Sequence, residues 1–401
     1  MYNIPFSPPD ISQDTINEVI DTLKSGWITT GPKTQLFEER LAEYIGNNKV
    51  VTTNSATAAM ELVLRVLGIG PGDEVITSAY TYTASASVIN HVGAKIVLVD
   101  TQKDSLEMDY DKLEQKINKN TKAIIAVDIA GKICDYKTIY KKIEKHNDIF
   151  KTNNDLHKKI GRIAVVADGA HSFGATRNGI ESGNFADFTC YSFHAVKNLT
   201  TSEGGAITWN KSLDIDDAEL YRIFKMYGLH GQTKDAFSKM KKGNWEYDIE
   251  VLGYKTNMTD ISASIGISQL KTYEENLKRR KEIVNKYDKN LQKNISFLKH
   301  IDSEFESSCH LYLTWIKGIS ELERNTIIEK MAEKGIATNV HYKPLPLLTA
   351  YKKLGFSITD YPNAYNAYKN EVSLPIYPQL TDDEVQYIIE QFNQIVGEIH
   401  D

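Results

Sequence analysis

The chain has 401 residues, of which 41% are hydrophobic and 25% charged, and its 47 basic and 53 acidic residues give a net charge of −6. This balance, without any long basic run, predicts neither a nucleic-acid partner nor a membrane partner. The length permits a large core and predicts two domains. The first residues, MYNIPFSPPD, lack the basic start and apolar core of a signal peptide, and no apolar stretch approaches the length of a membrane span.

The three cysteines, Cys134, Cys190 and Cys309, are scattered along the chain and lack the spacing of metal ligands. We therefore expect no metal site. An odd number of cysteines without evident pairing predicts a protein of the reducing cytoplasm.

Short apolar runs alternate with helical patterns in the first half of the chain. This alternation predicts a mainly parallel sheet that is covered on both faces. Two later apolar runs, 188–193 and 204–209, flank a polar loop and are expected to pair at the far side of the sheet. The other expected strands are 49–55, 73–80, 94–100, 121–131 and 162–168, and the expected helices are 55–67, 83–93, 110–118 and 136–146.

The second half of the chain predicts a smaller α+β domain. The polar, lysine-rich segment 147–161 is expected to be a surface loop or insertion, and 228–247 a long loop of a kind that is often functional. A strongly helical stretch, 258–293, is expected to lead to the second domain. There we expect a strand at 307–319, a helix at 322–335, a strand at 336–346 and a helix at 381–399.

A strand ends and a helix begins at small residues in the stretch TTNSATAAMELVL. The free N–H groups and the positive dipole end of a helix N-terminus suit a phosphate group. Thr57 could add a hydroxyl, and Ala56 allows the backbone to approach closely. The alternative is an ordinary capped helix with Ser55 or Thr57 as its N-cap.

Five more candidates follow predicted strands. Asp168 ends the run RIAVVAD, so its carboxylate is expected at the carboxyl edge of the sheet, where ligands of open α/β sheets bind, and His171 comes three residues later. Lys197 and Ser192 lie just beyond another strand end. Tyr82 follows the run EVIT and could offer an aromatic face to a planar ligand. Each of them could instead be an ordinary loop, surface or core residue.

Taken together, these residues supply a phosphate cradle, a carboxylate, an aromatic plate and an amine, all near strand ends. Pyridoxal phosphate needs that combination. The lysine would form the Schiff base. The aspartate would pair with the pyridinium nitrogen and keep it protonated, so that the ring can accept electrons.

The stretches SGWITTGPKTQLFEERLAEYIG, SFHAVKNLTTSEGGA, IATNVHYKP and SLPIYPQLTDDEV resemble the DegT/DnrJ/EryC1/StrS aminotransferases, and the resemblance runs nearly end to end. It implies the α/β fold type I of aspartate aminotransferase, with a mainly parallel, seven-stranded type of sheet and a smaller α+β C-terminal domain. We accordingly expect a large cofactor-binding domain at 1–260, whose N-terminal segment could pack on the small domain. A connecting helix is expected at 261–295 and the small domain at 296–401.

The resemblance also implies roles for individual residues. Lys197 would be the Schiff-base lysine and the proton shuttle, and Asp168 would bind the pyridine nitrogen. Tyr82 would stack on the ring, and His171 would lie near the cofactor's phenolic oxygen. The phosphate would be held by Ala56, Thr57 and Ser192.

The stretch GYKTNMTDISASIGISQL resembles a family segment in which an asparagine crosses the dimer interface to the partner subunit's cofactor phosphate. Lys255 stands at that asparagine position and Asn257 at the family's arginine position, and either could serve, since lysine is also a good phosphate partner. A site shared in this way implies a homodimer. Thr29, Thr30 and His341 are expected to border the sugar pocket, or else to be turn residues and a strand-end histidine.

The function implied is transfer of an amino group from L-glutamate to a nucleotide-linked 3-keto or 4-keto deoxyhexose, for a lipopolysaccharide, a capsule or another glycosylated product. A sugar dehydratase of the same family is an alternative, but those enzymes carry histidine at the lysine position, and Lys197 argues against it. Two further alternatives stay open. One is an aminotransferase for a cyclic ketone without a nucleotide, and the other is a non-catalytic regulator that binds pyridoxal phosphate.

Overall fold

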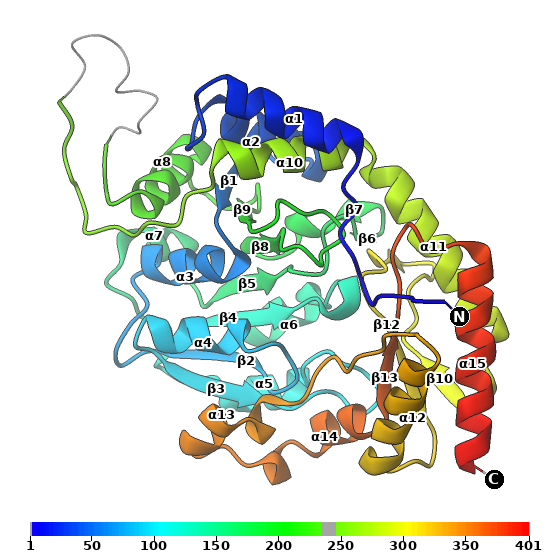
Figure 1. Cartoon of the computed structure of the whole chain (residues 1–401). Helices are drawn as coiled ribbons and strands as arrows, with labels where there is room; N and C mark the ends of the chain where they lie inside the picture. Colours follow the sequence, from blue (N-terminus) through cyan, green and yellow to red (C-terminus); the bar gives the residue numbers. More distant parts are fainter. Residues whose placement is uncertain (1, 234–245, 401) are drawn as a thin grey trace.

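Seven strands form a central sheet in the order β1-β9-β8-β5-β4-β2-β3 (Figure 1). The structure is a computed structural model that describes residues 2–233 and 246–400. All pairings are parallel except the two that β9 makes, with β8 and with β1, which confirms the predicted α/β class. The strands are β1 (Val50–Thr53), β2 (Glu74–Ser78), β3 (Lys95–Val99), β4 (Thr121–Val127), β5 (Ala164–Asp168), β8 (Phe188–Ser192) and β9 (Gly205–Trp209).

The strands are apolar on both sides because each of them feeds two cores. Consecutive side chains of a strand point to opposite faces. In β5, Val166 joins the core on one face, whereas Val165 and Ala167 join the core on the other. The first face is covered by α3 (Ala56–Val66), α4 (Ala84–His91) and α8 (Asp217–Gly228), and the second by α5 (Tyr110–Lys116) and α6 (Tyr136–Glu144).

A layer of helices covers the second face near β1 and β9. Its members are α2 (Pro32–Ile45) and α10 (Asp260–Lys271), whose apolar side chains pack on Val50 and Ala206. Helix α1 (Gln13–Lys24) lies against α10 (Figure 1), where Thr15 Oγ1 donates to Ser268 Oγ at 3.0 Å.

One predicted loop contains a helix. Within 147–161 the structure has α7 (Asp155–Ile160), which the Asn154 side chain caps by accepting from the N–H of His157 at 2.8 Å. Leu156 of this helix is buried in the core on the first face of the sheet, which we call the first core. The predicted loop or insertion thus ends in a short helix, because one cap and one apolar contact hold a helix whose composition is otherwise polar. In the other predicted loop, 228–247, residues 234–245 lie outside the described residues.

The C-terminal part forms a separate core around an antiparallel three-stranded sheet. Its strands are β10 (Ile295–Phe297), β12 (Tyr312–Ile316) and β13 (Glu371–Leu374), in the order β10-β12-β13. Helices α11 (Tyr273–Asn290), α12 (Glu321–Glu333) and α15 (Asp382–His400) contribute side chains to this core, and so does Ile4 from the N-terminal segment. The predicted helical stretch 258–293 is thus two helices, α10 and α11. A small third sheet joins β11 (Phe305–Glu306), β6 (Thr176–Arg177) and β7 (Ile180–Glu181).

Between α12 and β13 the chain returns to the large sheet. Helices α13 (Thr349–Lys353) and α14 (Pro362–Lys369) lie beside β3 (Figure 1), and Tyr351 and Tyr361 enter the first core. The segment 336–346, predicted as a strand, leads to these helices and forms only isolated bridges, at Ile336 and Asn339. That prediction was wrong because the segment crosses between the two units instead of continuing along a sheet edge.

None of the helices within the described residues combines the length and the apolar character that a membrane span requires. The described residues also contain no cluster of side chains suited to a metal ion. All three cysteines are buried and unpaired.

Candidate active site

A cavity of about 440 Å³ opens at the carboxyl ends of the central parallel strands. Strands β5 and β8 are adjacent and parallel, with Asp168 opposite Cys190, so residues that follow the two strands reach the same edge. The cavity brings together eight predicted residues, and its lining includes Ala56, Thr57, Tyr82, Asp168, His171, Ser192, Lys197 and His341.

One wall of the cavity is the N-terminus of α3. Ser55 caps this helix by accepting from the N–H of Ala58 at 3.1 Å, so the cap is Ser55 and not Thr57. The N–H groups of Ala56 and Thr57 come before the first intrahelical hydrogen bond and are left for an outside acceptor. Strand β9 passes very close here, since a Cβ on Gly205 would lie 2.4 Å from the carbonyl carbon of Ser55. The helix start can therefore hold an anion.

Asp168 lies at the bottom of the cavity and is only 5% exposed. Its Oδ2 accepts from the hydroxyl of Ser85 at 2.6 Å, and its Oδ1 accepts from the N–H of Ala170 at 3.2 Å. Burial raises the pKa of Asp168, and the hydrogen bonds and the charge of Lys197 oppose that rise. A carboxyl held in this way can form a strong charge-assisted hydrogen bond with a protonated ring nitrogen.

Lys197 lies in the loop after β8, where its N–H donates to the carbonyl oxygen of His194 at 2.9 Å. Its ammonium group has no hydrogen bond or ion pair with any other described residue. Burial lowers the pKa of Lys197 to about 8, although the charge of Asp168 acts in the opposite direction. A substantial fraction of the amine is therefore neutral near pH 8, which a nucleophilic lysine requires.

The imidazole of His171 is held in one protonation state. Its Nδ1 lies 3.1 Å from the N–H of Ala130, which can only donate, so Nδ1 is the acceptor. The hydrogen is then on Nε2, which lies 3.1 Å from the hydroxyl of Tyr342. Burial, followed by the charges of Lys197 and His341, lowers the pKa of His171 well below its usual value. This histidine is a neutral donor that fixes the position of Tyr342.

Ser192 and Tyr82 have few contacts of their own. The hydroxyl of Ser192 accepts a long hydrogen bond, at 3.4 Å, from the N–H of His194. Tyr82 is 59% exposed, and its ring centroid lies 5.9 Å from that of Tyr342. Both side chains are therefore available to a ligand in the cavity.

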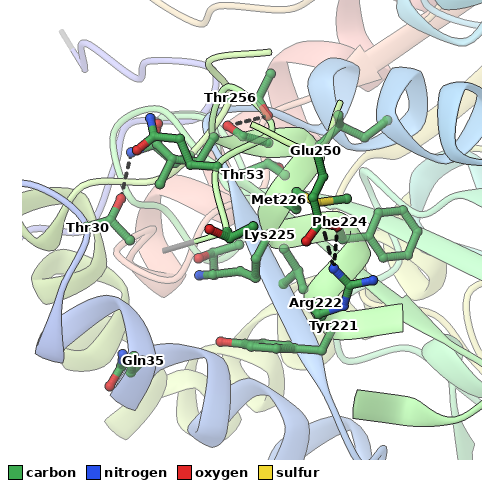
Figure 2. Close-up of a pocket in the computed structure, with 18 residues that line it drawn as sticks. Thr30, Gln35, Thr53, Tyr221, Arg222, Phe224, Lys225, Met226, Glu250 and Thr256 are labelled. Carbon is green, nitrogen blue, oxygen red and sulfur yellow. Dashed lines mark hydrogen bonds and ion pairs between the residues drawn. The ribbon is translucent and has the colours of Figure 1, made fainter. Parts of the chain in front are cut away.

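The other predicted residues lie elsewhere in the single chain. Figure 2 shows Thr30 beside a second pocket, of about 320 Å³, which Asn257 also lines. Asn257 Nδ2 donates to Thr30 Oγ1 at 2.6 Å, and Lys255 Nζ donates to Asn257 Oδ1 at 2.5 Å. Thr29 and Lys255 are exposed. One chain thus does not bring these four residues to the first cavity, and a role at a partner subunit's site stays a prediction.

Sequence reasoning missed Ser85 and Tyr342. Ser85 lies in the first turn of α4 and contacts Asp168, so the small residues of TASAS after a strand end were its available signal. Tyr342 directly follows His341 in the stretch NVHYKP and contacts His171. Long-range contacts of this kind have no periodic pattern in the sequence.

The residues of the cavity fit pyridoxal phosphate. A helix N-terminus with free N–H groups suits the phosphate, and the buried Asp168 suits the ring nitrogen. The amine of Lys197, without a partner among the described residues, suits the aldehyde.

Comparisons with known proteins agree with this geometry. The sequence pattern of the DegT/DnrJ/EryC1/StrS aminotransferase family matches residues 9–393. The spore coat polysaccharide biosynthesis protein SpsC of Bacillus subtilis is 36% identical over 400 residues, which cover 98% of this chain and 97% of that protein. The UDP-4-amino-4-deoxy-L-arabinose–oxoglutarate aminotransferase of Shewanella sediminis is 33% identical over 404 residues, which cover 98% of each chain.

Solved structures match as well. A sugar aminotransferase of Streptococcus pneumoniae in its PMP form has a TM-score of 0.96 and 55% identity, with 99% of this chain and 100% of that chain covered. The same protein in its PLP form also has a TM-score of 0.96. The fold, the cavity and the match over nearly the whole length lead to one conclusion. The chain belongs to the DegT/DnrJ/EryC1/StrS aminotransferase family and is a sugar aminotransferase that depends on pyridoxal phosphate.

Proposed function

We propose that the enzyme transfers an amino group from L-glutamate to a keto-sugar linked to a nucleoside diphosphate, with Lys197 as the catalytic residue. The observation that carries the proposal is the cavity, which brings together the amine of Lys197, the buried carboxyl of Asp168 and the open start of α3. Among the described residues that amine has no hydrogen-bond or ion-pair partner. The product is an amino sugar for a surface glycan. The names of relatives in polysaccharide and amino-sugar pathways support this destination.

Each residue of the cavity has a proposed task. Bound there, pyridoxal phosphate supplies an aldehyde that carries the amino group and a ring that accepts electrons. Asp168 holds a proton on the ring nitrogen, and the N–H groups of Ala56 and Thr57 bind the phosphate together with the hydroxyl of Ser192. Lys197 Nζ would hold the aldehyde until an amino substrate takes its place. The free amine of Lys197 would then accept the proton from the substrate's Cα and deliver it to the cofactor.

Two further residues orient the ring. Tyr82 is largely exposed to the cavity and can cover one face of a planar ring. His171, fixed as a neutral Nε2–H donor, holds the hydroxyl of Tyr342, and the pair would orient the cofactor near its phenolic oxygen.

The donor and the nucleotide are supported by a relative's name. The Shewanella enzyme is named for a UDP-linked 4-amino sugar and for oxoglutarate, and amination of oxoglutarate gives glutamate. By the same reasoning we favour amination at C4. We also propose a homodimer in which Lys255 or Asn257 reaches the partner's phosphate, because one chain leaves both residues outside the cavity. The three unpaired cysteines fit a reducing cytoplasm.

A substrate panel tests the proposal. The purified enzyme, loaded with pyridoxal phosphate, is treated with L-glutamate, and loss of the yellow colour reports the first half-reaction. UDP- and dTDP-linked 4-keto and 3-keto sugars are then added, and the products are identified by mass. A nucleotide-free cyclic ketone, an inosose, serves as the matched control. We expect amination of a nucleotide-linked 4-keto sugar, and equal or faster amination of the inosose would overturn the proposal.

A further inference from the structure

Three polar side chains form a chain that leads from the cavity into the small domain. His341 lines the cavity, and its Nδ1 lies 2.8 Å from the hydroxyl of Ser373. That hydroxyl lies 2.5 Å from Glu371 Oε1. Ser373 and Glu371 both belong to β13, and neither is exposed to any extent. A buried carboxyl is therefore connected to a cavity histidine through one hydroxyl.

The position of His341 is fixed from several sides. The backbone N–H of His341 donates to Glu371 Oε2 at 2.9 Å, and its backbone carbonyl oxygen accepts from the hydroxyl of Tyr80 at 2.8 Å. The ring of Phe6 stacks on the imidazole at a centroid distance of 5.3 Å. Within the described residues only Nε2 of the imidazole has no hydrogen-bond partner. This nitrogen is left for a ligand in the cavity that His341 lines.

A count of the hydrogens shows how Glu371 and Ser373 control which nitrogen of His341 carries a hydrogen. The Ser373 hydroxyl has one hydrogen, so when Glu371 is ionised Ser373 donates to it. Nδ1 of His341 must then donate to Ser373, and Nε2 is a bare acceptor. When these three side chains take up one proton, the proton resides either on Glu371 or on His341. In the first case Glu371 donates to Ser373, and Ser373 donates to Nδ1. In both arrangements Nε2 carries a hydrogen and becomes a donor.

The surrounding charges decide where that proton resides. Burial raises the pKa of Glu371 to about 8, against the hydrogen bonds from Ser373 and His341 and the charge of Arg324. Burial, followed by the charge of Lys197, lowers the pKa of His341 to about 3. The proton is therefore held on the carboxyl, and the imidazole stays neutral. The other titratable groups that interact with this pair are Tyr80, Tyr342, His171 and His310.

We propose that Ser373 and Glu371 are positioning residues that set the tautomer of His341, so that its Nε2 donates a hydrogen bond to an oxygen of the sugar substrate. The hydrogen-bond chain from β13 to the cavity carries the inference, and its link to the sugar rests on the proposed function. Below about pH 8 the carboxyl is protonated and Nε2 is a donor. Above that pH the carboxyl ionises, Nε2 becomes an acceptor, and a substrate oxygen without a hydrogen loses its partner.

Nuclear magnetic resonance of the cofactor-loaded enzyme labelled with [15N]histidine tests the tautomer directly. Long-range 1H–15N spectra identify which ring nitrogen carries the hydrogen, and the His341→Asn variant assigns the signal. We expect the Nε2–H tautomer at pH 7 and the Nδ1–H tautomer at pH 9.5. Glu371→Gln keeps a donor beside Ser373, so it should hold the Nε2–H tautomer at both pH values. An Nδ1–H tautomer at pH 7 that Glu371→Gln leaves unchanged would overturn the inference.

Rates of the two half-reactions separate the effect of the hydrogen-bonded residues Glu371, Ser373 and His341, here called the relay, from the cofactor chemistry. In Ser373→Ala the glutamate half-reaction should keep its rate, while kcat/KM of the sugar half-reaction falls about tenfold, as expected for one lost hydrogen bond. In Glu371→Gln the decline of the sugar half-reaction above pH 8, relative to the glutamate half-reaction, should disappear. Equal losses in both half-reactions would contradict a positioning role toward the sugar.

A matched control is available in the small domain. The hydroxyl of Ser307 lies 2.7 Å from Nδ1 of His300, and both residues are buried outside the cavity. Ser307→Ala therefore removes a similar buried serine–histidine contact and should change neither half-reaction. If the wild-type enzyme lacks the glutamate half-reaction, the proposed function fails, whereas the tautomer spectra still decide whether the relay exists.

Discussion

Asp128 follows β4 and Asp168 ends β5, the strand beside it, and the N–H of Asp128 donates to the carbonyl oxygen of Asp168 at 3.1 Å. Both carboxyls are buried, and burial raises the pKa of both. Asp128 accepts from the N–H of Cys134 and from the hydroxyls of Tyr136 and Ser172, at 2.8–3.0 Å. Asp168 accepts from two donors among the described residues and lines the cavity.

A structural carboxyl and a functional one at the same sheet edge thus differ in how fully the fold satisfies them. The fold satisfies Asp128 completely with its own donors, which is the usual state of a buried polar group. It leaves Asp168 with unused acceptor capacity in a cavity that also holds an unpaired amine. Unused capacity at a buried charge is costly for stability, so a bound ligand is the natural explanation for it.

Removal of the Lys197 amine should have the largest effect on turnover. In Lys197→Ala we expect turnover to fall by roughly 10⁴-fold, because the nucleophile and the proton carrier are lost together. The free energy of unfolding should not decrease, since the ammonium group has no partner among the described residues. The measurement is the rate of amino-sugar formation, together with urea unfolding. Lys211→Ala, at an exposed position, is the control, and a Lys197→Ala rate within tenfold of wild type would contradict the assignment.

The same substitution at the two carboxyls should have different effects. Asp168→Ala should reduce turnover by about 10³-fold, because nothing then holds the proton on the ring nitrogen. Asp128→Ala should instead reduce the free energy of unfolding by about 3 kcal/mol, because three donors lose their acceptor. Turnover per folded molecule should change far less in this second variant. The opposite pattern in rate assays and urea unfolding would show that the two roles have been exchanged.

How far the sequence predicts this site follows from the same contrast. Asp168 and Lys197 were found because each comes just after an apolar strand, and parallel strands end at one edge. Glu371 and Ser373 gave no such signal, since they lie within a short buried strand and contact His341 across 30 and 32 residues. The segment 336–346 was predicted as a strand, whereas the backbone groups of His341 within it bond to Tyr80 and to Glu371 of β13.

The buried carboxyl of Asp128 should also make the stability of the protein depend on pH. Burial raises the pKa of Asp128 to about 6, above its usual value, so the folded state binds a proton more tightly than the unfolded state. Stability from this group is complete below about pH 4 and is lost as the pH rises through 6. Between pH 4 and 7 the wild type should lose about 2 kcal/mol relative to Asp128→Asn, which does not titrate. Urea unfolding of the cofactor-free protein at both pH values measures this, and parallel profiles would contradict it.

The smallest effect should come from the wall of the cavity and not from its reactive groups. In Gly205→Ala the new Cβ would lie 2.4 Å from the carbonyl carbon of Ser55, so the start of α3 must shift away from β9. The N–H groups of Ala56 and Thr57 shift with it. We expect affinity for pyridoxal phosphate to fall about tenfold, which corresponds to the loss of roughly one hydrogen bond to the phosphate. The measurement is fluorescence titration of the cofactor-free protein with pyridoxal phosphate. Gly397→Ala, where the new Cβ meets no atom within 4 Å, is the control and should bind normally. Equal affinity in both variants would mean that the start of α3 does not hold the phosphate.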